Sequence, residues 1–390
     1  MGYIMHCGEI SDLPTPGLLI DINRLKMNIE KMAIKASENG VALRPHVKTH
    51  KCIEIARLQR EYGSGGITVS TLDEALIFAD AGFNDITYAV PISSNKIDTA
   101  FKIGERVHLN LLLDSMRAIE LLAKKSKERD IISDVLLKID CGYHRCGVDP
   151  NSYTSIKLVH KIVESSHLRF RGILTHAGHS YSAESIEQGK RIAKQEQQAM
   201  VDFVIKLNNE GRELKPEIVS IGSTPTISVT DSFMEGITEI RPGNYVFYDY
   251  TQVTLQSCRI EDCALTLLSR VIGRYDDHIV IDAGATALSK DLGPYDCEGE
   301  REFGKIYSDY ETNTIDTSLR IDSLSQEHGK VISRIPLPFG SIELDSMLRI
   351  LPNHSCLTAN LHDVYYIIDD LNIINQWKVQ RHRPITSACL

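Results

Sequence analysis

The chain has 390 residues, a net charge of −9 at pH 7, and 42% hydrophobic and 24% charged residues. This length accommodates one large domain and a smaller one, and the composition is ordinary for a globular enzyme. The acidic balance argues against nucleic acid or an anionic membrane as a partner, and nine cysteines, an odd number, do not suggest a disulfide framework.

The opening segment predicts neither export nor membrane insertion. The first ten residues, MGYIMHCGEI, lack the basic region and the apolar run of a signal peptide. No apolar run anywhere in the chain reaches 18 residues. We therefore expect a cytoplasmic protein without a membrane span.

Short apolar runs alternate with helical patterns over the first 250 residues. A strand and an amphipathic helix are predicted within 15–37, and helical patterns such as 71–82, 115–128 and 194–211 follow later. Eight further strands are predicted at 41–47, 66–70, 85–90, 107–114, 133–140, 170–176, 217–222 and 236–242. Strands that alternate with helices form parallel βα units, and eight of them close a (β/α)₈ barrel. An open, doubly wound sheet would fit the same count.

The pattern changes after about residue 250. Segments such as ALTLLSRVIGRY, HIVIDAG and DVYYIIDDLNIINQWKVQRH indicate strands and turns with little helix. We predict a barrel domain that ends at about residue 252 and a β domain that begins at about residue 253.

The stretch LRPHVKTHK places Arg44, His46 and Lys48 at alternate positions. In a strand these side chains would share one face, and a hydrophobic core does not tolerate such groups without partners. A barrel gathers the ends of its strands into one mouth, which is the face where such enzymes keep their active sites. We expect all three to point into the barrel, with Lys48 at the catalytic rim.

Other unusual polar segments follow the later strands, where a barrel gathers the strand ends into one mouth. They are CGYHRCG (141–147), THAGHSY (175–181), GSTPT (222–226) and RPGNY (241–245). Barrels commonly bind phosphate after their seventh and eighth strands, and Gly222, Ser223 and Thr224 offer close backbone approach and hydrogen-bond donors. A rim lysine beside a phosphate cradle suggests pyridoxal phosphate, with Lys48 as its Schiff-base partner. Alternatively, Lys48 pairs with a carboxylate and GSTPT is an ordinary turn.

The segment LPNHSCLTANLHD (351–363) contains the other chemical signal. If it is extended, His354 and Cys356 share one face, and imidazole with thiolate is a donor pair suited to zinc. Two protein ligands leave positions open for water or substrate, as a catalytic metal requires. The alternative is a core cysteine beside a surface histidine.

The chain contains, in this order, the motifs RPHVKTHK, GITVSTLDEA, THAGHSY, VSIGSTPT, VFYD, QEHG and LRILPNHSCLTANLHD. Together they resemble the D-serine dehydratase family over about residues 12–380. The family includes dehydratases of D-threo-3-hydroxyaspartate, and D-threonine aldolases are more distant relatives. The resemblance implies an alanine-racemase-type fold with a pyridoxal-phosphate barrel, a β domain joined by the first strand (GLLIDI), and a homodimer.

Carried over position by position, the resemblance makes Lys48 the Schiff-base lysine and His354 and Cys356 the ligands of Zn²⁺ or another divalent metal. It assigns five positions to the phosphate or the ring of the cofactor, and it places Arg145 near the ring. The five positions are Tyr181, Gly222, Ser223, Thr224 and Tyr245.

The resemblance implies a pyridoxal-phosphate- and metal-dependent dehydratase that converts a D-3-hydroxy amino acid to a 2-oxo acid and ammonia. The candidate substrates are D-serine, D-threonine and D-threo-3-hydroxyaspartate. The alternative is retro-aldol cleavage to glycine and an aldehyde, because the tail NLHD is similar to the aldolase form. A remote alternative is a non-enzymatic protein that binds pyridoxal phosphate.

Overall fold

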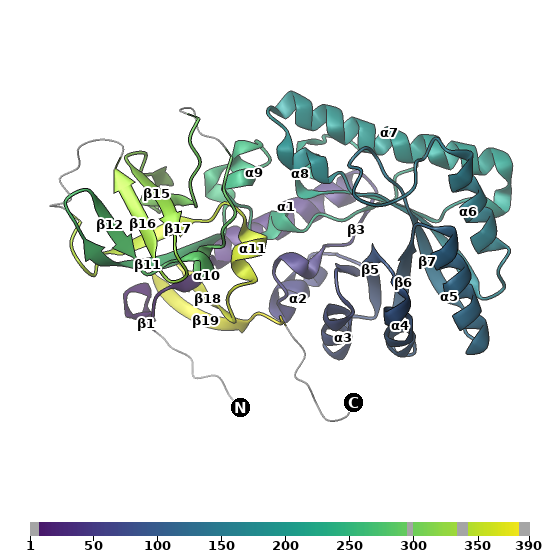
Figure 1. The fold of residues 1–390 in the computed structure, drawn as a ribbon, viewed down its shortest axis with the longest axis horizontal. Helices are drawn as coiled ribbons and strands as arrows, with labels where there is room; N and C mark the ends of the chain where they lie inside the picture. Colours follow the sequence, from purple (N-terminus) through teal and green to yellow (C-terminus); the bar gives the residue numbers. More distant parts are fainter. Residues whose placement is uncertain (1–7, 295–298, 334–341, 382–390) are drawn as a thin grey trace. The chain divides into compact units, whose positions relative to one another are not determined.

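The structure is a computed structural model that describes residues 8–294, 299–333 and 342–381. The chain forms two compact units (Figure 1). The barrel unit comprises Lys31–Lys48 and Ile55–Gly243, and the β unit comprises the described parts of Met1–Glu30, Thr49–Glu54 and Asn244–Arg381. The expectation about a signal peptide rests largely on residues 1–7, which lie outside the described residues.

Eight parallel strands form the sheet of the barrel unit. They are β3 (Ala42–Leu43), β4 (Ile67–Val69), β5 (Asp85–Pro91), β6 (His108–Leu113), β7 (Ser133–Lys138), β8 (Leu168–Leu174), β9 (Ile218–Ile221) and β10 (Glu239–Ile240). Their order is β3-β10-β9-β8-β7-β6-β5-β4, and an isolated parallel bridge between His46 and Thr68 links the two outer strands. The sheet thus curls back on itself, which confirms the predicted barrel rather than an open sheet.

One helix precedes the first barrel strand, and the others connect successive barrel strands or follow the strand β9. They are α1 (Ile22–Glu38), α2 (Ile53–Glu61), α3 (Leu72–Asp80), α4 (Ile97–Gly104), α5 (Met116–Glu128), α6 (Tyr153–Val163), α7 (Ile186–Glu210) and α8 (Thr224–Val229), with short 3-10 turns η2 (Val47–Thr49), η3 (Ser94–Lys96), η4 (Gly178–Ser182) and η5 (Arg212–Leu214). Side-chain caps fix where several helices begin. Thr71 accepts a hydrogen bond from the Glu74 N–H in a capping box, and Ser115 and Ser185 cap α5 and α7.

Lys48 does not lie in a strand, so the expectation that it shares a strand face with Arg44 and His46 is wrong. Strand β3 pairs with β10 over only two residue pairs, and the His46 N–H then donates to Pro242 O at 3.0 Å. Proline has no N–H to continue the ladder, and the chain turns into η2. Arg44 has the partners that burial demands: its guanidinium donates to Glu239 Oε2 at 2.6 Å and to Asp85 Oδ2 at 2.8 Å.

The β unit is built on a mixed sheet of strands that come from both ends of the chain. The strands are β1 (Gly8–Glu9), β2 (Gly17–Asp21), β11 (Leu265–Arg274), β12 (His278–Ile281), β13 (Lys305–Asp309), β14 (Thr314–Ile315), β15 (Leu319–Leu324), β16 (Gly329–Ser333), β17 (Met347–Leu351), β18 (Val364–Asp369) and β19 (Asn372–Lys378). Strand β2 pairs antiparallel with β11 and parallel with β18. The first strand therefore joins the β domain, as the family resemblance predicted.

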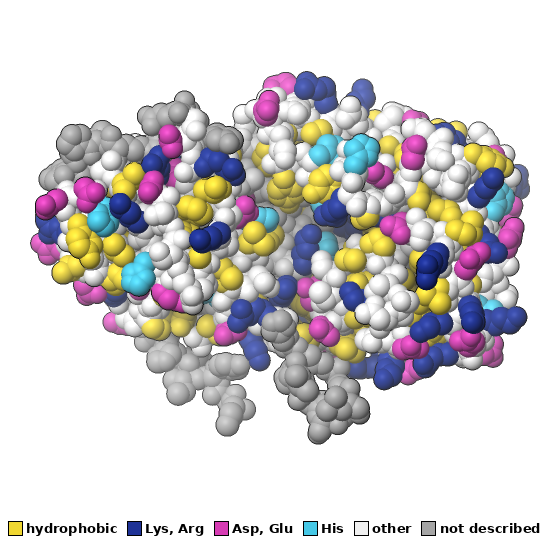
Figure 2. All heavy atoms as spheres, in the orientation of Figure 1, with side chains coloured by type: hydrophobic (Ala, Val, Ile, Leu, Met, Phe, Trp, Pro, Cys, Tyr) yellow, Lys and Arg dark blue, Asp and Glu magenta, His cyan; other side chains and the backbone are white. Residues whose placement is uncertain are grey.

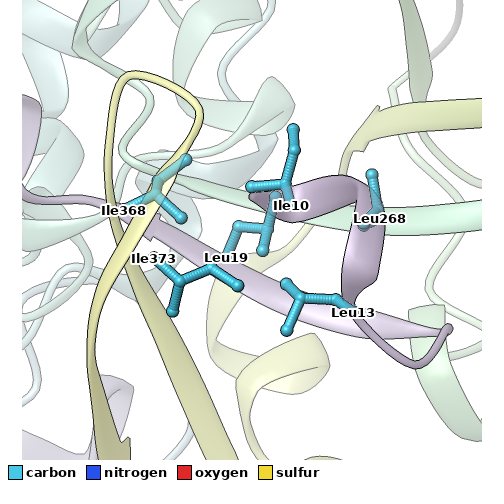
Figure 3. Close-up of a cluster of buried hydrophobic side chains, with 6 residues drawn as sticks. All are labelled: Ile10, Leu13, Leu19, Leu268, Ile368 and Ile373. Atoms are coloured by element: carbon cyan, nitrogen blue, oxygen red, sulfur yellow. The ribbon is translucent and has the colours of Figure 1, made fainter. Parts of the chain in front are cut away.

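A cluster of six buried side chains fixes this placement of the N-terminal strand (Figure 3). Leu19 of β2 is fully buried among apolar side chains from β11, β18 and β19, and the preceding turn η1 (Ile10–Asp12) contributes as well. Each such side chain stabilises the fold by about 1.5–3 kcal/mol. The members are Ile10, Leu13, Leu19, Leu268, Ile368 and Ile373.

The β unit also contains three short helices, α9 (Tyr250–Thr254), α10 (Ala285–Leu288) and α11 (Ser355–Ala359), and the 3-10 turns η6 (Asn244–Val246) and η7 (Ile260–Asp262). On the face shown in Figure 2, lysine and arginine side chains are intermixed with aspartate and glutamate over both units. Among the described residues, no helix combines the length and the apolar character that crossing a bilayer requires.

Candidate functional site

Lys48 lies in η2 just beyond the first barrel strand, and its side chain is half-buried. Its backbone N–H donates to Nδ1 of His46 at 3.5 Å, and Nε2 of His46 lies 3.4 Å from the Ser70 hydroxyl after β4. His176 follows β8, and its Nδ1 lies 2.9 Å from Gly222 O after β9. Residues that follow four different barrel strands therefore contact one another in pairs at the strand ends.

Buried cations surround these two histidines. Burial lowers the pKa of His46 well below its ordinary value, and Lys48 and Arg241 lower it further. Burial, Lys48 and Lys138 act in the same way on His176. Both imidazoles are therefore neutral near pH 7, and the net charge of this pocket comes from lysine and arginine.

Lys138, at the end of β7, is 3% exposed. Burial lowers its pKa to about 8, and the nearby Arg241 guanidinium acts in the same direction. No described carboxylate forms an ion pair with its ammonium. A buried cation without a carboxylate partner suits a pocket that receives an anionic ligand, so the barrel mouth fits a phosphorylated cofactor.

The loop after β9 has the backbone shape of a phosphate cradle, but buried protein groups occupy part of it. Gly222 has φ +128°, where side-chain-bearing residues are strained, and a Cβ there would lie 3.1 Å from Arg241 N. Its N–H donates to Oε1 of Glu196 at 3.0 Å, and the Ser223 N–H donates to the Thr226 hydroxyl at 3.3 Å. The loop is therefore ordered by the protein itself.

The buried carboxylate of Glu196, in α7, accepts hydrogen bonds from the loop after β9. It is 1% exposed, accepts hydrogen bonds from the N–H groups of Ala177 and Gly222, and accepts a third from the Thr226 hydroxyl at 2.8 Å. Burial raises its pKa. The carboxylate thereby ties the turn after β8 to the turn after β9.

The remaining predicted cofactor residues occupy different surroundings. Tyr181 lies in η4 and is half-buried. Arg145 is exposed, with its guanidinium 5.0 Å from the centre of the Tyr143 ring. Tyr245 belongs to the β unit, where η6 buries its side chain completely.

In the β unit, His354 and Cys356 lie at the start of α11, and the expectation that they belong to an extended segment is wrong. His354 is the N-cap, with φ −139° and ψ 95°, and Cys356 is in the first helical turn. Helix formation at Ser355 follows from its N–H, which donates to the buried Asp249 carboxylate at 2.9 Å. The two side chains nevertheless interact, since each shifts the pKa of the other.

Neighbouring groups favour a thiolate beside a firmly held imidazole. Burial alone would raise the pKa of the Cys356 thiol, but His354 lowers it overall. Burial opposes protonation of His354, yet Asp291 and Cys356 raise its pKa to about 11. Nδ1 of His354 lies 2.8 Å from Asp291 Oδ2, which leaves Nε2 as the nitrogen for a ligand.

Polar side chains around Cys356 complete the pocket. The Asn244 amide donates to the Cys356 sulfur at 3.5 Å and to Asp249 Oδ2 at 2.6 Å, and the Thr49 hydroxyl oxygen lies 3.3 Å from the Cys356 sulfur. The buried Asn244 Oδ1 has no hydrogen-bond partner among the described residues. The soft nitrogen and sulfur donors, with this oxygen beside them, fit a zinc ion that keeps positions for water or substrate.

No group of three or more histidine, cysteine and acidic side chains in the described ranges is arranged to hold a metal. His362, just beyond α11, lies with Nε2 3.0 Å from Ala287 O and so anchors a neighbouring backbone segment. Within these ranges, His354 and Cys356 are therefore the pair of donors that remains for a metal in the β unit.

Several supporting residues escaped the sequence-based prediction. Glu196 had a usable signal, since an acidic residue occupies the apolar stripe of a helix pattern, and Arg241 stands in the quoted segment RPGNY. Asp291 had none, because it lies 63 residues before His354 and no motif contains it. A carboxylate this far away in sequence can be assigned to a site only when the fold shows it beside its partner.

Comparison with known proteins places the chain in a family. A family model described as alanine racemase, N-terminal domain, matches residues 20–251, and a serine dehydratase domain model matches residues 264–368. The D-serine dehydratase of Dictyostelium discoideum is 37% identical, covering 96% of this chain and 98% of the relative. The D-threo-3-hydroxyaspartate dehydratase of Delftia sp. is 34% identical, with 94% and 97% covered.

More distantly, the D-threonine aldolase of Arthrobacter sp. is 24% identical, with 95% of this chain and 93% of the relative covered. The solved structure of the Delftia enzyme matches with a TM-score of 0.88 at 32% identity and covers 95% of this chain and 98% of its own. Other structures of that enzyme include a metal-free form with one cysteine replaced by alanine and a form with the histidine two positions earlier replaced by alanine. The chain belongs to the D-serine dehydratase family and is a pyridoxal-phosphate-dependent lyase with the alanine racemase fold, as its motifs predicted.

Proposed function

We propose that this protein removes water from a D-3-hydroxy amino acid and releases a 2-oxo acid and ammonia. The names of the two dehydratase relatives support this reaction, and both relatives are matched over nearly their whole length. In the reaction the Cα–H and Cβ–O bonds break, and hydrolysis of the resulting enamine gives the two products. D-serine, D-threonine and D-threo-3-hydroxyaspartate are the candidate substrates.

Lys48 is the residue that we assign to the cofactor aldehyde and to removal of the Cα proton. Lys48 lies close to both His46 and His176, and a lysine amine at the mouth of a barrel can form a Schiff base with an aldehyde. Pyridoxal phosphate, when bound, supplies an electron sink for the negative charge that develops at Cα. The lysine then holds the removed proton.

The phosphate and the ring of the cofactor are assigned to the residues that the family resemblance selected. Gly222 permits close backbone approach, and Ser223 and Thr224 begin α8 beside it. Because Glu196 already orders the Gly222 N–H, the buried cations provide most of the charge for an anion here. Tyr181, Tyr245 and Arg145 complete the proposed set.

His354 and Cys356 are assigned as ligands of a divalent metal, with zinc preferred because the donors are nitrogen and sulfur. The two variants of the Delftia enzyme, with the same two-residue spacing of histidine and cysteine, support this assignment. A metal there would act as a Lewis acid toward the departing hydroxyl group. The observation that carries the choice of dehydration is this histidine–cysteine pair, which the Delftia dehydratase also has at the same spacing.

We also propose the domain bounds, the oligomeric state and the cellular location of the protein. We propose that residues 23–252 form the cofactor-binding domain and that 1–22 with 253–390 form the β domain that carries the metal ligands; the ends 1–7 and 382–390 lie outside the described residues. The family models matched at 20–251 and 264–368 support this division. A homodimer and a cytoplasmic location are also proposed, and light scattering and cell fractionation test them.

Products formed from the three candidate substrates test the reaction. With D-threonine we expect 2-oxobutanoate and ammonia, measured by lactate dehydrogenase coupling and by an ammonia assay. Glycine and acetaldehyde as the main products would overturn dehydration in favour of retro-aldol cleavage. That cleavage needs a base at the β-hydroxyl, and the candidate base His179 has a buried Nδ1 without a hydrogen-bond partner among the described residues.

A further inference from the structure

The carboxylate of Asp291 contacts His354 on the side away from the proposed metal. Oδ2 of Asp291 lies 2.8 Å from Nδ1 of His354. Among the described residues, no other side chain bonds to this carboxylate. A histidine whose Nδ1 is engaged in this way presents Nε2 in a fixed direction and tautomer.

Asp291 is itself held by residues on both flanks of His354. The side chain of Asn353, the residue before His354, donates to Asp291 O at 3.1 Å and to Glu302 O at 2.6 Å. After His354, the Thr358 hydroxyl donates to Leu288 O at 3.0 Å. The segment that carries Asp291 is therefore bonded to the segment that carries the ligands at several independent points.

The Asn353 side chain is buried and closely packed. Asn353 is 3% exposed, and a Cβ on Gly293 would lie 2.6 Å from its Oδ1. Glycine at position 293 allows the loop to run directly against the amide that anchors Asp291. Because Asn353 is held in this way, the contact between Asp291 and His354 differs from a surface ion pair of two long, freely rotating side chains.

A second aspartate–histidine pair in the β unit has none of this support. Asp277 Oδ1 lies 2.6 Å from Nδ1 of His278, but the two residues are adjacent in sequence and the Asp277 side chain is 79% exposed. The His278 ring stacks on Tyr275. The Asp277–His278 pair provides a matched control, since it has the same chemistry without the buried amide scaffold.

We propose that Asp291 is a positioning residue that orients His354 for metal binding, through the contact of its carboxylate with Nδ1 and through the Asn353 anchor. The proposal rests on the proposed role of His354 and Cys356 as metal ligands. Removing a group that hydrogen-bonds to a metal-ligating histidine typically weakens metal affinity about 10- to 100-fold. The expected effect is therefore on metal affinity even in the absence of substrate.

The test measures zinc affinity of the full chain, stripped of metal by a chelator and with pyridoxal phosphate in place, by competition against a chromophoric chelator. We expect Asp291→Ala to weaken zinc binding about 10- to 100-fold. Asp291→Asn keeps a hydrogen-bond acceptor but loses the charge, so it should show a smaller loss. Asp277→Asn should bind zinc as the unmodified protein does.

Two further measurements separate the possible failures. The unfolding temperature of each metal-free variant shows that the fold is intact at the temperature of the zinc titration, so that lost zinc affinity is not confused with unfolding. Zinc affinity of Asp291→Ala and Asp291→Asn within twofold of the Asp277→Asn value would overturn the positioning role. If His354→Ala and Cys356→Ala retained full zinc affinity, the proposed metal site itself would be wrong, which is a distinguishable result.

Discussion

Two candidate sites, one in each unit, surround their histidines with opposite charges. In the barrel unit, burial beside Lys48, Lys138 and Arg241 keeps His46 and His176 neutral. In the β unit, Asp291 and the Cys356 sulfur raise the pKa of His354 to about 11 despite burial. Burial is common to both, so the neighbouring charges decide the outcome. The first arrangement prepares a pocket for an anion, and the second prepares a donor pair for a cation.

The largest effect should come from the amine in the barrel pocket. We expect Lys48→Ala to lower turnover by about 10³-fold or more, because the proposed base is lost. Borohydride reduction followed by peptide mapping should label Lys48 with the cofactor in the unmodified protein. Lys51→Ala is the control, since its ammonium donates to Asn360 Oδ1 at 2.7 Å in the β unit. Label on Lys51 instead of Lys48 would reverse the assignment.

Removing either proposed metal ligand should lower elimination without releasing the cofactor. We expect His354→Ala or Cys356→Ala to lower elimination by about 10²-fold or more, as loss of a Lewis acid predicts. The visible absorption of the bound cofactor should persist, because Lys48 is untouched. A chelator should have the same effect and added zinc should reverse it. His278→Ala should behave as the unmodified protein, and full elimination activity without metal would contradict the proposed role.

A smaller effect is expected where the backbone approaches the proposed phosphate. Gly222→Ala forces a side chain onto a residue with φ +128° and brings Cβ to 3.1 Å from Arg241 N. Strain of about 1–3 kcal/mol should weaken cofactor binding roughly tenfold or more. Gly189→Ala in α7 is the control, because its Cβ would meet only Val229 at an ordinary 4.0 Å. Equal cofactor affinity in both variants, measured by fluorescence titration, would show that the loop is not part of the cofactor site.

The smallest effect concerns a histidine of the barrel unit that departs from the neutral pattern. His108 bonds to Asp134 and Asp85, which raise its pKa to about 9 from 6.5. The stabilisation is fully present below pH 6.5 and is lost as the pH rises from 6.5 to about 9. The side chain is 37% exposed, so solvent screening limits the contribution to about 1 kcal/mol or less.

Thermal unfolding between pH 6.5 and 9 measures this contribution. We expect His108→Gln to unfold at a lower temperature by about 2 °C at pH 6.5 and by less at pH 9. His167→Gln is the control, because its partner Asp130 is fully exposed and lies 3.8 Å away. An equal destabilisation at both pH values would mean that the charge of His108 does not contribute.

Periodicity was sufficient to predict the eight barrel strands, since buried parallel strands are short apolar runs between helices. It overestimated the length of β3 and β10, because the proline in RPGNY ends their hydrogen-bond ladder after two residue pairs. The motif at His354 and Cys356 named the donor pair but not its conformation, because a buried carboxylate from Asp249 starts the helix there. Asp291 and Glu196 could not be assigned roles, since their partners are made by tertiary packing and not by spacing along the chain.

The N-terminal strand β2 has a consequence for how the chain folds during synthesis. Its two hydrogen-bonded neighbours, β11 and β18, begin at Leu265 and Val364, so they leave the ribosome only after the whole barrel unit. Until then the apolar side chains of β2 lack the strands against which they pack. The β unit must therefore be assembled last and from both directions of the chain, and a nascent chain halted before Leu265 would expose an unpaired strand edge to aggregation.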